Sequence, residues 1–414
     1  MRKKVICLIA VSFIVTNIEV CRAQATLSLR EAVEKALQSR ASLKAEAERV
    51  TAAEGLEKQA KLLPNPSFEF QNENLRPGQT YTKDVDTLAM ISTPLDVLGK
   101  RKQRIALAAE GVNRAQADRN LARSQVVQRV KFAYWTARGS QEILEVLKST
   151  NDNFQKIVDY NAAQFSQGAI AEQDLLRVRL EAERLQITRE AALIEAGRDR
   201  AELLRQMGQS GLTTLLTLTE PLAPTEAVTP LSAEQVVQNR AEIKAARAAV
   251  EQARANVRLQ EVSARPDMNL LAGYKRTELP DTTTGVNTAM VAFRITLPFA
   301  DRNQGNRQAA EAEVRRQQQL MAEAEAQVRA DYYGALDEYR LRHIEVDNAL
   351  APLREHAANI STIANAAYTA GAVDLLRLLD AERARLEADL MWTRGIVDYR
   401  QSIARLEAAE GIEQ

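Results

Sequence analysis

The stretch GKRKQRIALAAEGVNRAQADRNLARSQVVQRVKFAYWTARGSQEILEVLKSTNDNFQKIVDYNAAQF, residues 99–165, contains nothing that would end a helix. It has no proline, and after its first residue the only glycines are Gly111 and Gly139. A continuous helix over this stretch would be about 100 Å long. A second run of similar length, residues 305–368, is interrupted only by Pro352. Two rods of matched length predict an elongated molecule.

The composition agrees with long helices better than with a compact core. Aromatic residues make up 5% of the chain and charged residues 27%, which is typical of helices that pack through small side chains. Lys plus Arg and Asp plus Glu both number 55, so no strong field exists to attract nucleic acid. We therefore expect no nucleic-acid partner.

Residues 1–25 have the three parts of a secretory signal peptide. A basic start at residues 2–4 is followed by an apolar run at residues 5–15 and by the small residues Ala23 and Ala25. The apolar run is shorter than the roughly 20 residues that span a bilayer. We expect cleavage after Ala25.

Cleavage would remove both cysteines of the chain, Cys7 and Cys21. The mature protein would then have neither a disulfide nor a thiolate metal site. Lipidation at Cys21 is not expected, because Glu19 and Val20 stand where small residues are needed. No later segment is apolar enough for a spanning helix, so any membrane crossing would have to use strands.

The mature chain begins with one predicted amphipathic helix over residues 26–62. Ser28 and Glu31 have the spacing of a capping box at its start. Pro64 and Pro66 prevent the helix from continuing.

A β-hairpin is predicted next, at about 64–97, because apolar and polar residues alternate there with period two. The long helix at 99–165 and a further helix at 172–207 follow. Together these elements form a first structural repeat, residues 26–208. A proline-rich linker at 209–230 ends it.

The same order of elements returns in residues 231–414. The second repeat has a first helix, a hairpin at about 266–298, a long helix at 305–368 and a last helix at 374–410. The motif Asp374-Leu375-Leu376 echoes Asp174-Leu175-Leu176. An offset of about 200 residues relates the halves, which indicates an internal duplication.

Four strands of about ten residues are long enough to cross an outer membrane when tilted. A lipid bilayer cannot satisfy an open sheet edge, and the smallest spanning barrels have eight strands. Several copies would therefore have to close one barrel, and three copies would supply twelve strands. The alternative is a small periplasmic sheet at the end of a coiled coil.

The order of elements, together with Leu63-Pro64-Asn65-Pro66 and the sequence TPLDVLGKR at residues 93–101, resembles the TolC-like outer membrane efflux family. The two motifs are similar to its cation-efflux branch, the CzcC- and CusC-like channels. The resemblance implies a mainly α fold with a β-barrel part. It implies a homotrimer in which a 12-stranded barrel in outer membrane lipid continues into a periplasmic α-barrel. It also implies two partners, a periplasmic adaptor and an inner-membrane pump of the resistance-nodulation-division (RND) type.

By this resemblance the loops at 76–83 and 278–285 face outside, and the turns near Gly168 and Gly371 form the periplasmic mouth. Glycine at these turns has the backbone freedom that a tight turn needs. Family members close the mouth through an aspartate, a tyrosine and an arginine. Asp174 and Tyr368 match the first two positions, whereas Val373 occupies the third.

Family channels also carry aspartate rings inside the mouth. Asp380 matches one ring position, Arg377 replaces the other, and Asp374 lies one turn earlier. The hypothesis is that Asp374 or Asp380 forms a cation-favouring constriction that adaptor binding opens. The alternative is that these residues are solvated helix charges.

Nothing in the sequence indicates an enzyme. His343 and His356 lack the three- or four-residue spacing that would put two metal ligands on one helix face. Both are expected to be ordinary helix residues. Since no phosphate loop or nucleophile motif occurs either, we expect no cofactor.

The predicted function is a passive outer membrane conduit of a tripartite efflux system that exports heavy-metal cations. A drug, dye or solvent efflux channel with the same fold is one alternative. A periplasmic coiled-coil scaffold is another.

Overall fold

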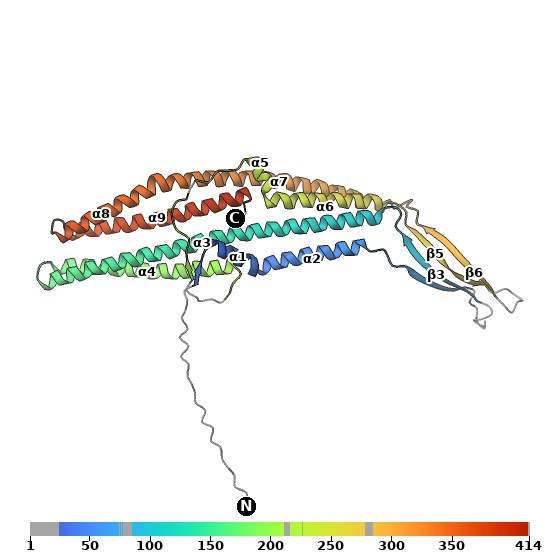
Figure 1. The fold of residues 1–414 in the computed structure, drawn as a ribbon, viewed down its shortest axis with the longest axis horizontal. Coiled ribbons are helices and arrows are strands. Elements are labelled where there is room, and N and C mark those ends of the chain that lie inside the picture. The colour runs from blue at the N-terminus through green and yellow to red at the C-terminus, as the bar shows by residue number, and fades with distance from the viewer. Residues whose placement is uncertain are drawn as a thin grey trace, which may run out of the picture.

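The structure, a computed structural model, describes residues 25–412 except 74, 76, 78–84, 211–215, 226 and 278–284. Residues 1–24 of the predicted signal peptide and most of the two strand-connecting loops lie outside these residues. The described chain is a long helical bundle with a sheet at one end and, at the other end, two turns that each connect a pair of helices (Figure 1). The elongated shape predicted from the two rods is therefore present.

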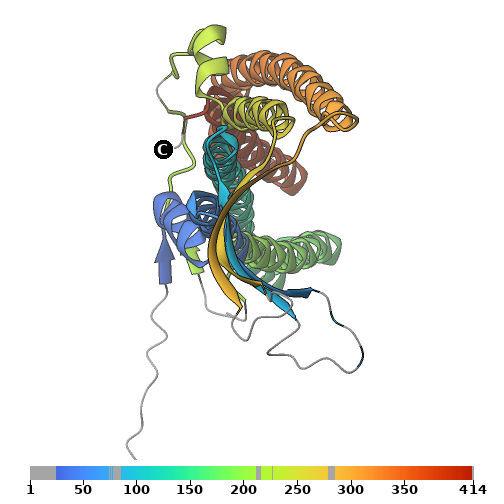
Figure 2. The same cartoon turned by 90° about the vertical axis from the view of Figure 1, so that its right-hand side faces the viewer.

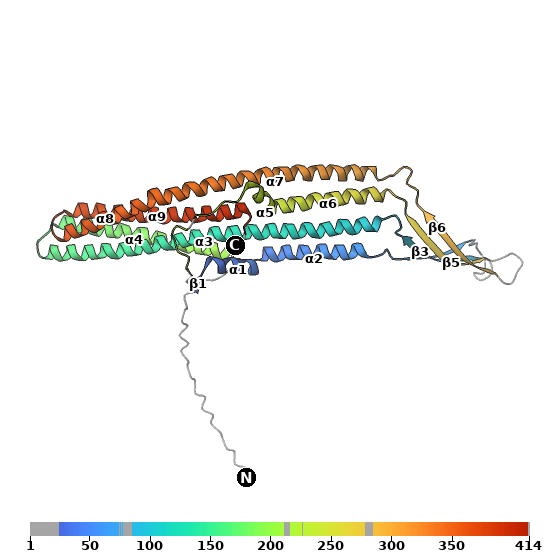
Figure 3. The ribbon, with the colours of Figure 1, turned by 45° about the horizontal axis from the view of Figure 1, so that its top comes forward.

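Helix α3 (Lys100–Ser166) runs without a break from the sheet to the far end of the molecule. Toward the sheet it packs against α2 (Ala41–Lys61) and α6 (Ala241–Ser263). Toward the other end it packs against α4 (Glu172–Gln206) and α9 (Leu375–Glu410) (Figure 3). Helix α3 thus contacts both halves of the duplicated chain.

The second rod is also continuous, but it contains one wide turn. It consists of α7 (Gln304–Glu345), a π-helical turn (Val346–Leu350) and α8 (Ala351–Thr369). Pro352 lacks an N–H group, and its ring would collide with a carbonyl of the preceding α-helical turn. The π-helical turn before it widens the helix, so the predicted interruption is a local change of winding.

The prediction of one helix over residues 26–62 is wrong. The chain instead forms β1 (Ala25–Leu27), α1 (Leu29–Ser39) and α2, with Arg40 in an extended conformation between the helices at ψ 119°. The predicted capping box is present, because the Ser28 side chain accepts from the N–H of Glu31 and the Glu31 carboxylate accepts from the N–H of Ser28. The prediction is wrong only in continuing this helix beyond Ser39.

A long-range hydrogen bond accounts for this break. Nη1 of Arg40 donates to the carbonyl of Gln206 at 2.6 Å, at the C-terminal end of α4. The second repeat has the same arrangement between α5 (Ala233–Asn239) and α6, where Nη1 of Arg240 donates to the carbonyl of Ala408 at 2.9 Å. In both repeats an arginine at a helix break caps a distant helix.

Two glycines allow these breaks to approach the capped helices. Gly208 and Gly411 have φ values of +72° and +73°. A Cβ atom would lie 3.0 Å from the Cα of Arg40 at the first position and 3.1 Å from the backbone carbon of Asn239 at the second. A larger residue would therefore have to push the two helices apart.

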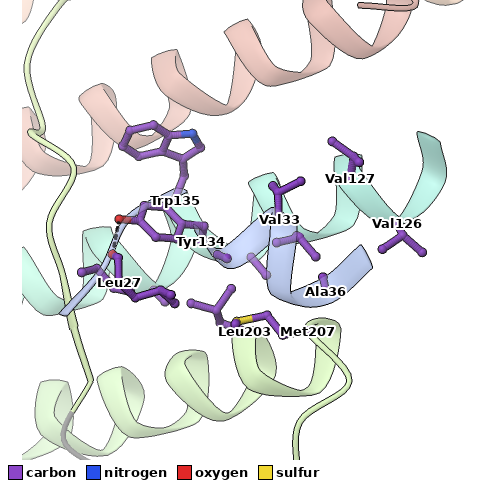
Figure 4. Packing of buried hydrophobic residues seen from close by; sticks show 14 residues of the cluster. Leu27, Val33, Ala36, Val126, Val127, Tyr134, Trp135, Leu203 and Met207 are labelled. Carbon is purple, nitrogen blue, oxygen red and sulfur yellow. Dashed lines mark hydrogen bonds between the residues drawn. The ribbon is translucent and has the colours of Figure 1, made fainter. Parts of the chain in front are cut away.

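The segment predicted as a linker, residues 209–230, contains a short strand, β4 (Leu216–Leu218). It pairs in parallel with β1 and brings the start of the first repeat to its end. Figure 4 shows the core beside this pair, where α1, α3 and α4 meet. The hydroxyl of buried Tyr134 donates to the carbonyl of Leu27 at 2.9 Å, so α3 holds β1 directly.

The four longer strands form one antiparallel sheet in the order β2-β3-β5-β6, which curves across the end of the bundle (Figure 2). Their bounds are Ser67–Glu73, Asp86–Leu95, Met268–Thr277 and Val286–Ile295. Each repeat supplies one hairpin, and β3 pairs with β5 between the repeats. Among the described residues, β2 and β6 each keep one unpaired edge.

The register of the sheet places large apolar side chains on one exposed face. Phe68, Ile91, Ala272 and Val291 are cross-strand partners in one row. The side chains of Phe68 and Val291 are 69% and 72% exposed. The opposite face buries a small cluster of Leu88, Met90 and Leu271.

Glu410 is a carboxyl group buried in the second repeat. Its Oε1 accepts from the N–H of Leu231 at 2.9 Å, and the neighbouring Tyr332 hydroxyl donates to the carbonyl of Leu231 at 2.5 Å. Burial raises the pKa of Glu410 above its usual value. The folded state therefore favours the protonated group, and this contribution to stability is lost as pH rises through the raised pKa.

We predict that Glu410→Gln raises the unfolding temperature by a few degrees at pH 8, because glutamine keeps the acceptor without the buried charge. The difference from the wild type should disappear below pH 4, where the carboxyl is protonated in both folded and unfolded chains. Thermal unfolding followed by circular dichroism at several pH values measures this. The exposed residue Glu355 offers a control in Glu355→Gln, and an equal effect of both variants would contradict the prediction.

Candidate functional site

At the end of the bundle farthest from the sheet, two tight turns of the same construction connect α3 to α4 and α8 to α9 (Figure 1). Gly168 and Gly371 both have a φ of +72°. The N–H of Gly168 donates to the carbonyl of Phe165 at 2.9 Å, and that of Gly371 donates to the carbonyl of Tyr368 at 3.0 Å. A residue that ends a helix with a left-handed backbone and this hydrogen bond is usually glycine. Both glycines therefore have a structural role.

The helices that follow the two turns begin differently. Helix α4 begins after Ala171, which makes no side-chain cap, and Asp174 lies in its first turn. Helix α9 begins after Asp374, whose carboxylate accepts from the N–H of Arg377 at 3.1 Å. Counted from the glycine of each turn, Asp374 corresponds to Ala171, and Arg377 corresponds to Asp174. The echo between the two Asp-Leu-Leu motifs is therefore out of structural register by one helical turn.

A hydrogen bond between α8 and α3 joins the two repeats at this end. The Tyr368 hydroxyl on α8 donates to Oδ1 of Asn161 on α3 at 2.7 Å. Asn161 is fully buried, and its amide donates to the carbonyl of Ile157 at 2.8 Å. The ring of Tyr160 packs edge-on against Tyr368, with centroids 6.0 Å apart.

Two of the predicted site residues, Asp174 and Tyr368, lie close enough to interact electrostatically. Burial raises the pKa of Tyr368, the hydrogen bond to Asn161 opposes this, and the charges of Tyr160 and Asp174 add to the rise. Tyr368 is therefore a protonated donor at neutral pH. The residue that receives its bond, Asn161, was not predicted from the sequence, although an asparagine within an apolar helix face is a signal that could have identified it.

The residues Val373, Arg377 and Asp380 lie together on a different face. They line a groove of about 470 Å³ between α8 and α9, beside the exposed side chains of Ile360 and Ile363. Tyr368 instead lines a pocket of about 300 Å³ between α3, α8 and α9. The structure thus divides the predicted site residues between two faces of the second helical hairpin.

Asp380 is exposed but not isolated. Its carboxylate lies 3.6 Å from Nη1 of Arg383, and Nη2 of Arg383 lies 2.5 Å from the carboxylate of Glu181 on α4. Asp374 is also exposed, but one of its carboxylate oxygens accepts the hydrogen bond that caps α9. The carboxylates of Asp374 and Asp380 therefore each contact a neighbouring group, and both are exposed to solvent in the single chain.

The Tyr368 pocket also contains a buried acidic group. Glu382 is only 3% exposed, and its carboxylate accepts from the Ser361 hydroxyl at 2.6 Å. This hydrogen bond joins α8 to α9 beside the pocket that Tyr368 lines.

Neither histidine belongs to a metal site within the described part of the chain. The ring of His343 stacks against Tyr339 and Tyr399, and its Nε2 lies 3.6 Å from Asp347. His356 is exposed on α8. Among the residues that the structure describes, no group of three or more His, Cys, Asp or Glu side chains could hold a metal ion.

None of the described helices combines the length and the apolar character needed to cross a membrane.

Comparison with known proteins identifies the relatives of this chain. The cobalt-zinc-cadmium resistance protein CzcC of Cupriavidus metallidurans is 25% identical over 378 residues, which cover 88% of this chain and 85% of CzcC. The outer-membrane channel OprN has a similar structure, with a TM-score of 0.75 and 20% identity over 93% of this chain and 90% of that one. A structure of CusC gives a TM-score of 0.74 and 18% identity over 92% of both chains.

The outer membrane efflux protein family matches residues 32–220 and again residues 233–411. The two matches correspond to the two repeats, and the solved structures have the same mainly helical fold with a four-stranded sheet. The family consists of channels and not of enzymes, and its location excludes a scaffold confined to the periplasm. The chain belongs to the outer membrane efflux protein family, as a channel of the outer membrane that extends into the periplasm.

Proposed function

We propose that three copies of this chain form one tube that exports divalent heavy-metal cations. The observation that carries the choice of substrate is the similarity to CzcC, a protein named for cobalt, zinc and cadmium resistance, over most of both chains. Since the tube has no energy source of its own, it works with a periplasmic adaptor and an inner-membrane RND pump. A drug, dye or solvent channel with the same fold is the alternative.

The sheet supports assembly of several copies. The outer edges of β2 and β6 have no partner among the described strands, and a bilayer offers no hydrogen bonds to such edges. Pairing β2 of one copy with β6 of the next satisfies both edges. Three copies then close a barrel of twelve strands, with the exposed apolar face toward lipid.

The helices support the same assembly. Four apolar side chains form a stripe along α4 at spacings of four and seven residues, namely Leu176, Leu180, Ile187 and Ile194, which are 54%, 47%, 70% and 67% exposed in one chain. A stripe of this kind at the flank of a helical bundle indicates a protein contact. A neighbouring copy at this flank would bury it and extend the bundle into a closed α-barrel.

The turns at Gly168 and Gly371 form the periplasmic mouth of the proposed tube. The Tyr368–Asn161 hydrogen bond holds the second helical hairpin against α3 and so favours a narrow mouth. Three copies of Asp380, with Asp374 six residues earlier in the chain, provide negative charge near the opening. The adaptor opens the mouth by moving the second hairpin away from α3.

We predict that Tyr368→Phe increases the single-channel conductance of the purified protein in planar bilayers, because the hairpin loses its hydrogen bond to α3 and keeps only the apolar contacts. The buried acceptor of Asn161 would then lack a donor, which costs about 1–3 kcal/mol in the closed form. Tyr160→Phe is a matched control, since the Tyr160 hydroxyl accepts from the partly exposed Gln164 on its own helix. Unchanged conductance in Tyr368→Phe would exclude a role of this hydrogen bond in keeping the mouth narrow.

We predict that Asp374→Asn combined with Asp380→Asn lowers the permeability ratio of K⁺ to Cl⁻, because both negative charges near the opening are removed. Asparagine is chosen because its side-chain oxygen keeps the helix cap at position 374. Reversal potentials in a KCl gradient measure this ratio. Glu387→Gln, at an exposed position on the same helix, is the control. An unaltered ratio would favour the reading that Asp374 and Asp380 are solvated helix charges.

The export function is tested in the native host by deleting the gene and restoring it on a plasmid. We expect the deletion to lower the tolerated concentrations of Co²⁺, Zn²⁺ and Cd²⁺ several-fold and to leave tolerance of ethidium and solvents unchanged. The protein should fractionate with the outer membrane and change its gel migration on heating. Sensitivity to dyes in place of metals would establish the alternative channel, and recovery from the soluble periplasm alone would rule out both.

A further inference from the structure

Four arginines gather where the helices meet the sheet. Arg101 and Arg104 lie in the first turns of α3, directly after β3. Arg265 precedes β5, and Arg302 follows β6. We call this set the junction arginines. Arg104, Arg265 and Arg302 are exposed, and Arg101 is partly exposed.

Backbone carbonyls hold all four guanidinium groups in place. Nε of Arg101 donates to the carbonyl of Lys61 at 3.1 Å, and Arg104 donates to those of Ala60 and Leu62 at 3.3 and 3.2 Å. Nη1 of Arg265 donates to the carbonyl of Leu98 at 2.7 Å. Nε of Arg302 donates to the carbonyl of Phe299 at 3.3 Å. These bonds orient the groups but do not neutralise their charge.

The nearby carboxylates have other partners. Asp96 accepts from the backbone N–H of Arg101 at 3.1 Å, and Asp301 accepts from that of Asn303 at 2.8 Å. Asp267 pairs with Lys100 at 2.8 Å, and Glu57 pairs with Lys61 at 2.6 Å. No junction arginine forms an ion pair with a carboxylate in the part of the chain that the structure describes.

The junction arginines lie next to the proposed membrane-crossing surface. The apolar face of the sheet ends toward the helices at the row formed by Leu95, Met268 and Ile295. All four arginines occur within about ten residues of this row along the chain. Because the apolar band of a barrel is about 25 Å tall, the phosphate layer of the periplasmic leaflet lies directly beyond its end.

Guanidinium chemistry fits that layer. Each arginine has five N–H donors in a planar fork that matches the oxygens of a phosphate, and the carbonyl bonds occupy only one or two of them. Basic side chains at this depth attract anionic lipid headgroups.

We propose that the junction arginines form a collar that binds the headgroup phosphates of anionic phospholipids in the periplasmic leaflet. This inference rests on the proposed crossing of the membrane by the sheet. The collar sets the depth of the channel in the bilayer, since four oriented cations from each copy surround the end of the barrel.

The test measures phospholipids that remain bound to the full-length protein in detergent, by native mass spectrometry. We expect the wild type to retain phosphatidylglycerol at least tenfold more than phosphatidylcholine. Arg265→Gln combined with Arg302→Gln should reduce this preference to less than threefold. Arg179→Gln combined with Arg198→Gln, at exposed positions on α4, should leave it unchanged.

Several outcomes would overturn the collar. A wild type without preference for phosphatidylglycerol excludes it even if the variants fail to fold, and so does a preference that survives in the junction variant. Displacement of the lipid by millimolar inorganic phosphate would indicate a site for free phosphate in place of a lipid contact. Outer membrane fractionation and heat-modifiable migration of the junction variant are measured alongside, so that a failed collar is distinguished from a failed membrane assignment.

Discussion

The packing of helices from both repeats against one uninterrupted helix, α3, is the constraint on which this structure depends. Its middle section buries Val126, Val130 and Ala133, and Gly139 lies so close to α9 that an added Cβ would be 2.5 Å from Val397. Small residues at these positions let the helices of both repeats approach over a great length. Had α3 ended midway along the bundle, the half beside the sheet and the half beside the two turns would be separate units.

In both repeats an arginine lies where a helix is interrupted midway along the bundle, at a level that we call the equator. Arg40 and Arg240 break a helix locally, and each caps a helix that ends more than 160 residues later. The hydrogen bonds that a continuous helix would have made are replaced by bonds that join the start of a repeat to its end. The equator is therefore fixed by long-range polar contacts as well as by the apolar cores on either side of it.

Much of this arrangement could be predicted from the sequence, since its main signals are local. The absence of helix-stopping residues predicted both rods, the period-two patterns predicted the hairpins, and the repeated order predicted the duplication. The breaks at Arg40 and Arg240 could not be predicted, because arginine is a good helix former and its capped partners are distant. Strand β4 was missed because three residues carry no readable period.

The candidate site was predicted less completely. Both turn glycines, Asp174 and Tyr368 were singled out from the sequence for the proposed mouth, but Asn161 and the division of these residues between two faces required the structure. The correspondence of Asp374 with Asp174 failed because a three-residue motif does not determine where a helix begins. A side-chain cap at Asp374, absent at Ala171, determines it.

The π-helical turn at Val346–Leu350 gives the two repeats unequal stiffness. The first rod is α-helical throughout, whereas the second changes its winding between the equator and the mouth. Bending of a long helix concentrates where its regular hydrogen-bond ladder is interrupted. We therefore expect the first rod to resist bending more than the second, so that a force on the turns at Gly168 and Gly371 would bend mainly the second rod.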